Sequence, residues 1–144
     1  MIAPASSASE GAPLKAPQSP SPGRRMPGRT AALGDYGERL AARYLREQGF
    51  EVLDTKWRCR NGEIDIVAVD GATVVVCEVK TRRHEAFGHP RESVTVRKLA
   101  RLRRLAAQWL QRQQRTFDDI RIDVVTILRP ATGAATVEHL RGVG

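Results

Sequence analysis

The sequence is poor in the residue types that mark several protein classes. Only two of its 144 residues are cysteines, Cys59 and Cys77, and neither belongs to a CxxC pair or to a cluster with histidine. The sequence therefore indicates neither a disulfide scaffold nor a structural zinc site. Apolar runs are short, such as Val74-Val75-Val76-Cys77, whereas a bilayer-spanning helix needs about 18 or more apolar residues. We expect a protein of a reducing, cytoplasmic setting with no membrane insertion.

Acidic residues are scarce relative to basic ones. The chain has 24 Lys and Arg against 16 Asp and Glu, which gives a formal net charge of +8. This balance favours polyanionic partners, because Lys and Arg that neutralise phosphates release condensed counterions. The length suffices for about one domain with its own core. Nucleic acid is therefore the expected class of partner.

The first 30 residues have few large apolar side chains and hold six of the eight prolines. This composition is typical of disordered segments, which cannot bury enough apolar surface to fold. The segment also has no apolar core of a secretory signal. We expect residues 1–30 to form a disordered tail and residues 31–144 to form one domain.

Hydrophobic periodicity predicts an α/β domain with the element order α-β-β-β-α-β-β. Helical spacing predicts one helix over residues 33–48, ended by Gly49, and a long helix over residues 93–115. Apolar runs bounded by turn residues predict strands over residues 50–57, 63–69, 73–80, 119–128 and 135–140. Residues 58–62 are expected to form a basic turn, and residues 81–90 an exposed loop.

Charged residues interrupt the second and third predicted strands. Both strands are apolar on two faces, the pattern of strands that are covered on both sides, yet they contain Asp65, Glu78 and Lys80. Charges in such strands need a compensating role. An Asp70-Gly71 two-residue turn would place Asp65 opposite Val76. Asp65 and Glu78 would then be diagonal neighbours on one face, with Lys80 one pleat further along.

This convergence of charges predicts a metal site. Two carboxylates beside an ammonium group suit Mg²⁺ or Mn²⁺, which take oxygen ligands and are commonly held by one or two carboxylates and a substrate phosphate. Such a metal generates hydroxide, while Lys80 would orient the attacking water or offset developing charge. We therefore expect phosphodiester hydrolysis, with Asp65 and Glu78 as metal ligands. The alternative is a strand-end ion pair of Lys80 with one of these carboxylates.

Four blocks of sequence connect the chain to a known family. They are Gly34-Asp35-Tyr36-Gly37-Glu38, Asn61-Gly62-Glu63-Ile64-Asp65-Ile66-Val67, Val76-Cys77-Glu78-Val79-Lys80-Thr81-Arg82, and Ser93-Val94-Thr95 through Lys98. On these blocks, residues 33–128 resemble the YraN family of uncharacterised bacterial proteins. That family is predicted to belong to the PD-(D/E)XK nuclease superfamily and is similar to archaeal Holliday-junction resolvases.

The resemblance implies a restriction-endonuclease-like core, a mixed central β-sheet flanked by helices. Asp65, Glu78 and Lys80 match the catalytic signature of the superfamily. Glu38 matches its helix-one glutamate and would be an auxiliary metal ligand among the catalytic residues, whereas Ile64 stands where the superfamily has proline. The implied activity is cleavage of DNA, including branched or distorted DNA, and a resolvase-like role would favour a symmetric homodimer.

Basic residues gather around the second predicted helix. Residues 80–115 contain eleven Lys and Arg but only two Glu, and such uncompensated charge favours contacts with phosphates. The expected nucleic-acid-binding residues are Arg82, Arg83, Arg97, Lys98, Arg101 and Arg104. Lys98 has two readings, an additional cation at the site or a lysine whose stem lies along apolar surface. His84 and His89 are assigned to the phosphate-facing loop and not to catalysis.

Two other functions remain open at this point. The chain could be a non-catalytic nucleic-acid-binding module on the same fold, with function carried by the arginines. It could also be an interaction protein whose basic face docks an acidic partner. Cys77 and Trp109 are assigned to the core, and Asp123 either to structure or to support of the site.

Overall fold

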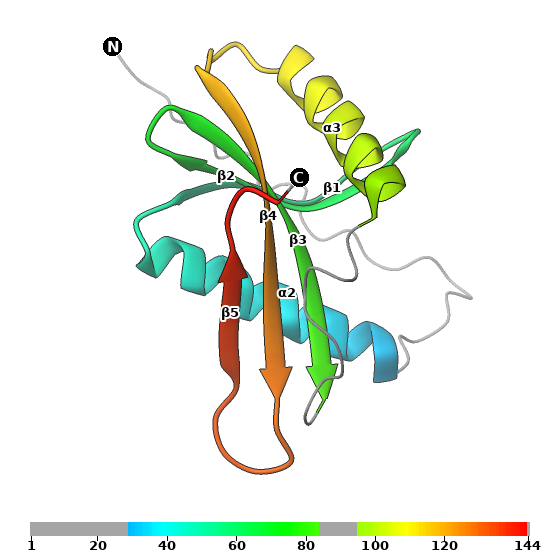
Figure 1. Ribbon diagram of the computed structural model, residues 1–144, viewed down its shortest axis with the longest axis vertical. Coiled ribbons are helices and arrows are strands. Elements are labelled where there is room, and N and C mark those ends of the chain that lie inside the picture. The colour runs from blue at the N-terminus through cyan, green and yellow to red at the C-terminus, as the bar shows by residue number, and fades with distance from the viewer. Residues whose placement is uncertain (1–28, 84–94, 144) are drawn as a thin grey trace, which may run out of the picture.

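The computed structural model describes residues 29–83 and 95–143 (Figure 1). The elements are helix α2 (Arg29–Glu47), strands β1 (Glu51–Cys59), β2 (Gly62–Asp70) and β3 (Thr73–Arg83), helix α3 (Val96–Gln111), and strands β4 (Asp119–Arg129) and β5 (Thr136–Leu140). The predicted order α-β-β-β-α-β-β is confirmed. None of the helices in these two ranges is long and apolar enough to cross a membrane. The predicted tail falls almost entirely outside the described residues and stays a prediction.

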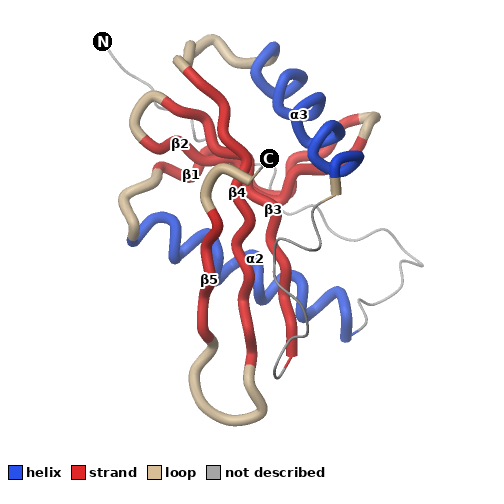
Figure 2. The backbone as a smooth tube through the Cα atoms, in the orientation of Figure 1, coloured by secondary structure: helices blue, strands red, loops and turns tan. Residues whose placement is uncertain are grey.

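The five strands form one mixed sheet in the order β1-β2-β3-β4-β5. Strands β3 and β4 are parallel, and the other neighbours are antiparallel. A parallel pair needs a crossover connection, which here includes α3. Figure 2 shows the two helices against the sheet. This agrees with the restriction-endonuclease-like core that the family resemblance implies.

Both faces of the sheet are covered, as the apolar central strands predict. Val74 and Val76 pack in one core with Leu102 and Trp109 of α3. Neighbouring side chains of β3 point the other way and pack in a second core with α2, and Cys77 there is fully buried. The central strands therefore lie between two hydrophobic cores, and a charge inside them is costly unless it is compensated.

Both helices differ from their predicted bounds. Helix α2 begins at Arg29, four residues before the expected start, and ends at Glu47 before Gly49, whose φ of 95° suits glycine. Helix α3 is shorter than expected, because Thr95 caps its first turn by accepting a hydrogen bond from the Lys98 backbone N–H. Its last residue is Gln111, so the helix ends four residues before the predicted end.

The predicted loops on either side of the central hairpin are wrong in length. Strand β1 extends to Cys59, which pairs with Gly62, so the expected five-residue basic turn is only Arg60-Asn61. Strand β3 extends to Arg83 because β4 offers a parallel partner for every residue as far as Arg129. This pairing could not be read from the local pattern. His84 and His89 lie outside the described residues.

The predicted register of the β2–β3 hairpin is also wrong. Asp70 pairs with Thr73, so Gly71 and Ala72 are the central residues of the turn. Gly71 has a φ of 67° and Ala72 has no positive φ, which is the type II′ pattern with glycine at the first central position. The pairing is shifted by two residues, so Asp65 lies level with Glu78 and not with Val76. An even shift keeps each side chain on its face.

Strands β2 and β3 separate just before the candidate site. Their last pair is Ile66 with Cys77. Beyond it, β2 pairs only with β1, from Ile64 to Gly62, while β3 pairs only with β4. Asp65 and Glu78 are the first residues past this fork, so the fold places both carboxylates where the sheet opens.

Candidate active site

The Asp65 side chain bridges the fork in the sheet. Its Oδ2 atom accepts a hydrogen bond of 2.8 Å from the backbone N–H of Val79. This bond gives the Val79 N–H a partner at the point where the β2–β3 pairing has stopped. Asp65 is therefore held against β3 by its own carboxylate, directly beside Glu78.

Asp65 is poorly compensated as a carboxylate. Burial, opposed by the Val79 hydrogen bond and reinforced by the charges of Glu78, Glu38 and Glu63, raises its pKa to about 7. No cation forms an ion pair with it among the described residues. A buried carboxyl surrounded by acidic groups is the setting in which a bound cation would be most stabilising.

Glu78 is contacted by two lysines from different elements. Its Oε2 atom lies 3.3 Å from Lys80 Nζ on β3 and 2.7 Å from Lys98 Nζ on α3. Burial and the neighbouring Lys98 lower the pKa of Lys80. Burial also opposes the charge on Lys98, but its hydrogen bond to Glu78 raises its pKa overall. Lys98 therefore lies at the candidate site as an additional cation. This is the first of the two interpretations that the sequence left open for it.

Glu38 approaches the fork from α2, but it is held by a cation that the sequence did not single out. Lys56 Nζ lies 2.6 Å from Glu38 Oε1 and 2.6 Å from Asp35 Oδ1. Burial opposes the charge on Lys56, but the two carboxylates raise its pKa. Lys56 is also the one non-glycine residue of the described chain with a positive φ, 53°. No local signal distinguishes it from an ordinary exposed strand lysine.

The carboxylates fit a metal ion as a pair and not as a triad. Among residues 29–83 and 95–143, no three side chains of Asp, Glu, His or Cys form a group that could hold a metal ion. Asp65 Oδ1 and Glu78 Oε1 have no partner in the described part of the chain. Two carboxylate oxygens and several waters are an acceptable donor set for Mg²⁺. Asp65 and Glu78 therefore fit a divalent cation, while Glu38 forms its contact with Lys56.

Thr126 is a further residue of this region that the sequence did not indicate. It pairs with Lys80 across the β3–β4 ladder, so the two side chains share a face. Its hydroxyl is buried and has no hydrogen-bond partner in the described structure. A threonine in an apolar strand gives no sequence signal that its hydroxyl is buried beside Lys80 without a hydrogen-bond partner.

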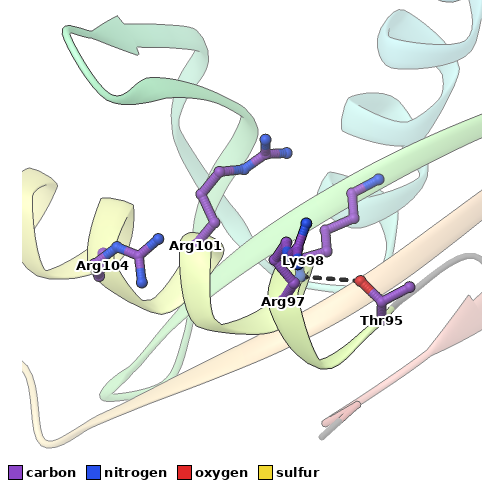
Figure 3. Close-up of a pocket in the computed structure, with 5 residues that line it drawn as sticks. All are labelled: Thr95, Arg97, Lys98, Arg101 and Arg104. Carbon is purple, nitrogen blue, oxygen red and sulfur yellow. Dashed lines mark hydrogen bonds between the residues drawn. The ribbon is translucent and has the colours of Figure 1, made fainter.

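The basic residues predicted to bind nucleic acid are brought together only in part. Arg97, Lys98, Arg101 and Arg104 line, with Thr95, an open cavity of about 390 Å³ on α3 (Figure 3). We call these four cations the α3 basic face. Arg82 and Arg83 lie apart from it in sequence, at the end of β3. Lys98 is part of the α3 basic face and also contacts Glu78, so the α3 basic face adjoins Glu78.

Asp123, by contrast, is not part of the site. Its carboxylate accepts two hydrogen bonds from Arg121 and one from the Gly142 backbone N–H, and it contacts His139 Nε2 at 2.8 Å. His139 Nδ1 in turn lies 3.1 Å from the hydroxyl of Tyr44 on α2. The side chain of Asp123 is fully buried. Of its two predicted roles, the structure supports the structural one.

Comparisons with known proteins place this α/β chain in a family. Residues 37–127 match the model of the uncharacterised protein family UPF0102. A UPF0102 protein of Beutenbergia cavernae is 59% identical over 113 residues, which cover 78% of this chain and 96% of that protein. A UPF0102 protein of Nocardioides is 55% identical over 113 residues, which cover 78% of this chain and 91% of that protein. One from Streptomyces coelicolor is 56% identical, covering 78% and 88%. The chain belongs to the UPF0102 family, which is the YraN family of the sequence analysis, so that family assignment is confirmed.

Proposed function

We propose that this protein is a Mg²⁺- or Mn²⁺-dependent endonuclease that hydrolyses phosphodiester bonds of DNA in the cytoplasm. One observation carries the proposal. The sheet opens at Asp65 and Glu78, so that a poorly compensated carboxyl with a pKa of about 7 lies beside a carboxylate flanked by two lysines. Shifted pKa values and converging charges of this kind are concentrated at functional sites.

The side chains have distinct roles in this proposal. Asp65 and Glu78 would hold the cation, which when bound supplies Lewis acidity and lowers the pKa of a bound water. The lowered pKa of Lys80 increases the share of neutral amine, which can accept a proton from the attacking water. Lys98 keeps its charge through Glu78 and offsets negative charge on the phosphate. Glu38, fixed by Lys56, adds negative charge beside Asp65.

Substrate binding in this proposal rests on the α3 basic face. Its cations lie on the same side of the sheet as Glu78, because Lys98 belongs to both. Contacts of Lys and Arg with phosphates position a nucleic acid without reading its sequence. Branched or distorted DNA and a homodimer that cuts paired strands stay part of the proposal, and sedimentation of the full chain tests the dimer.

The deciding experiment is cleavage of labelled single strand, duplex, flap and four-way junction DNA with Mg²⁺, Mn²⁺ or EDTA. We expect metal-dependent cleavage by the natural chain and none by Glu78→Ala, purified in parallel. Glu47→Ala is the matched control, because Glu47 is an exposed glutamate whose one ion pair within residues 29–83 and 95–143 is with Arg43. Equal cleavage by Glu78→Ala and the natural chain would refute the proposed site.

One observation favours a non-catalytic nucleic-acid-binding module as a second candidate. The Oε2 atom of Glu78 is already contacted by two ammonium groups, and no third carboxylate joins a metal cluster among the described residues. In such a module the lysines and Glu78 would form a structural ion-pair network. Tight, salt-sensitive binding in every metal condition with no cleavage would support this candidate over the nuclease.

A further inference from the structure

A groove between α2 and β1 lies on the side of the sheet away from α3. Its volume is about 540 Å³, and its lining residues are Asp35, Glu38, Arg39, Ala42, Arg46, Thr55 and Lys56. Asp35, Arg39, Ala42 and Arg46 follow one another at intervals of three or four, with Glu38 next to Arg39, so the helical residues form a single edge of α2. The small side chain of Ala42 lies midway along this edge and leaves the groove open.

The opposite wall of the groove depends on the unusual backbone of Lys56. Consecutive side chains of a regular strand point to opposite faces, yet Thr55 and Lys56 both line the groove. The left-handed conformation of Lys56 breaks the alternation at this point. Such a conformation is unfavourable for a residue other than glycine. It persists here together with the two contacts of Lys56 to α2.

Charge changes along the groove. At the fork end, Lys56 is neutralised by Asp35 and Glu38. Further along α2, Arg39 and Arg46 are exposed, and neither forms a hydrogen bond or ion pair with any described residue. Arg46 also borders an adjoining cavity of about 310 Å³ beside β1. The pKa of the Asp35 carboxyl is lowered chiefly by its hydrogen bond with Lys56, and Arg39 adds to this only through space. The groove therefore leads from an acidic end at the candidate site to a basic end with two guanidinium groups that form no close ion pair within the described chain.

The acidic end connects the groove to the fork in the sheet. Glu38 lies in the groove, and its charge acts on Asp65. Lys98 reaches Glu78 from the other side. The candidate site is therefore approached by cations on both faces of the sheet, the α3 basic face on one and Arg39 with Arg46 on the other.

We propose that the α2–β1 groove is a second contact surface for the phosphate backbone of a nucleic acid, with Arg39 and Arg46 as its binding residues. The inference rests on nucleic acid as the substrate class of the proposed function. A bound strand would contact both faces of the sheet at the fork. Exposed guanidinium groups that form no close ion pair with a carboxylate of the described chain are suited to phosphate, to which arginine can donate two parallel hydrogen bonds.

The test is the salt dependence of DNA binding by the full chain in EDTA, where cleavage is prevented. The probes are a fluorescein-labelled duplex and the matching single strand, titrated at about 50 to 200 mM salt. We expect Arg39→Gln/Arg46→Gln to reduce the slope of log K against log salt by about two for the duplex, about one for each lost phosphate contact. Affinity at low salt should fall by at least about tenfold.

The matched control is Arg43→Gln/Arg115→Gln, which also removes two exposed positive charges. Arg43 and Arg115 pair with Glu47 and Glu51 and do not line the groove. We expect less than half the slope change of the groove variant. The proposal is overturned if the groove variant keeps the natural slope, if the control loses as much, or if the natural chain shows no salt-dependent binding. Binding as expected without cleavage in Mn²⁺ would refute only the nuclease.

Discussion

Asp65 and Asp123 occupy similar places in the sequence and very different places in the structure. Each interrupts an apolar strand at the centre of the sheet. Asp123 is surrounded by donors from Arg121, His139 and Gly142, and these hold its pKa below the usual range although burial opposes ionisation. Asp65 has one donor, the Val79 N–H, and burial raises its pKa to about 7.

The difference shows how structure separates a supporting carboxylate from a candidate functional one. Around Asp123, β4, β5 and the C-terminal segment supply donors until every oxygen is satisfied. At the fork, the neighbouring groups are mostly acidic, and one oxygen of Asp65 is left without a partner among the described residues. A buried charge with a complete set of partners is tolerated by the fold, whereas one without such partners costs stability and is retained for another reason.

Asp123→Ala should have the largest effect on stability. It leaves Arg121 and the buried His139 without their shared partner, and removal of one member of a buried ionic network costs about 3–5 kcal/mol. The free energy of unfolding in urea measures this loss. Asp119→Ala, at the exposed start of β4, is the control and should cost less than about 1 kcal/mol. A similar small loss for Asp123→Ala would mean that its network contributes little.

Asp65→Asn should act in the opposite direction and should depend on pH. The pKa of Asp65 is about 7 in the folded chain and about 3.9 when unfolded. The unfolded state therefore binds fewer protons between these values, and stability falls as pH rises from about 4 to 7. Asparagine keeps an acceptor for the Val79 N–H without the charge. We expect a gain of about 2 kcal/mol at pH 8 that vanishes near pH 4.

Urea unfolding of both chains across this pH range measures the effect of Asp65→Asn. Asp123→Asn is the matched comparison, because its carboxylate is stabilised and its removal should reduce stability at neutral pH. A pH-independent difference between Asp65→Asn and the natural chain would show that Asp65 does not titrate as described. The proposed endonuclease activity should be lost in Asp65→Asn in spite of the added stability.

Lys98→Met should change stability by less than about 1 kcal/mol, because Glu78 keeps Lys80 as a partner. The larger expected effect of Lys98→Met is on the pKa of Lys80 and on the proposed cleavage activity. Lys98 lowers the pKa of Lys80, so its removal should raise that pKa. The proposed cleavage activity should fall at least about tenfold and its rise with pH should move to higher pH. A fall in activity with an unchanged pH profile would speak against coupling of the two lysines.

Lys56→Asn should have the smallest effect on stability, within about 0.5 kcal/mol. Asparagine tolerates the left-handed backbone. The ion pair with Asp35 that it removes is half-exposed on both sides, and the one with Glu38, whose side chain is 17% exposed, accounts for most of the loss. Lys56→Val removes the same charge, but a β-branched residue is strained at positive φ and should cost about 1–2 kcal/mol more. Thermal unfolding compares the two variants. Equal stability of both would argue against the left-handed conformation.

Much of the fold could be predicted from local pattern. Apolar residues on both faces of the predicted strands indicated that the central strands are covered on both sides, and the two hydrophobic cores confirm this. The predicted order of all seven elements was also correct. Errors arose where a distant partner decides the outcome. Strand β3 is lengthened by its parallel pairing with β4, and the register of β2 with β3 depends on which residues form the centre of the turn. Neither is visible in a window of neighbouring residues.

The residues of the candidate site could also be predicted only in part from the sequence. Asp65 and Glu78 were found because a charge in an apolar strand is unusual in the sequence itself. Lys56 was missed because a lysine in an exposed strand is ordinary, and only its φ and its contacts with Asp35 and Glu38 set it apart. Thr126 was missed for the same reason. Asp123 could not be assigned, because its partners lie as far away as β5.

The sequence by itself indicated the family, through the resemblance of four motif blocks. It also determined the order of elements and the residues whose charge conflicts with an apolar strand, because composition and periodicity are local properties. Only the tertiary structure decided which of those charges are satisfied. It opened the sheet at Asp65 and Glu78, brought Lys98 and Lys56 to the fork from α3 and β1, and closed a complete set of donors around Asp123. Electrostatic compensation depends on distances between side chains that are far apart in sequence, and these distances exist only in the folded chain.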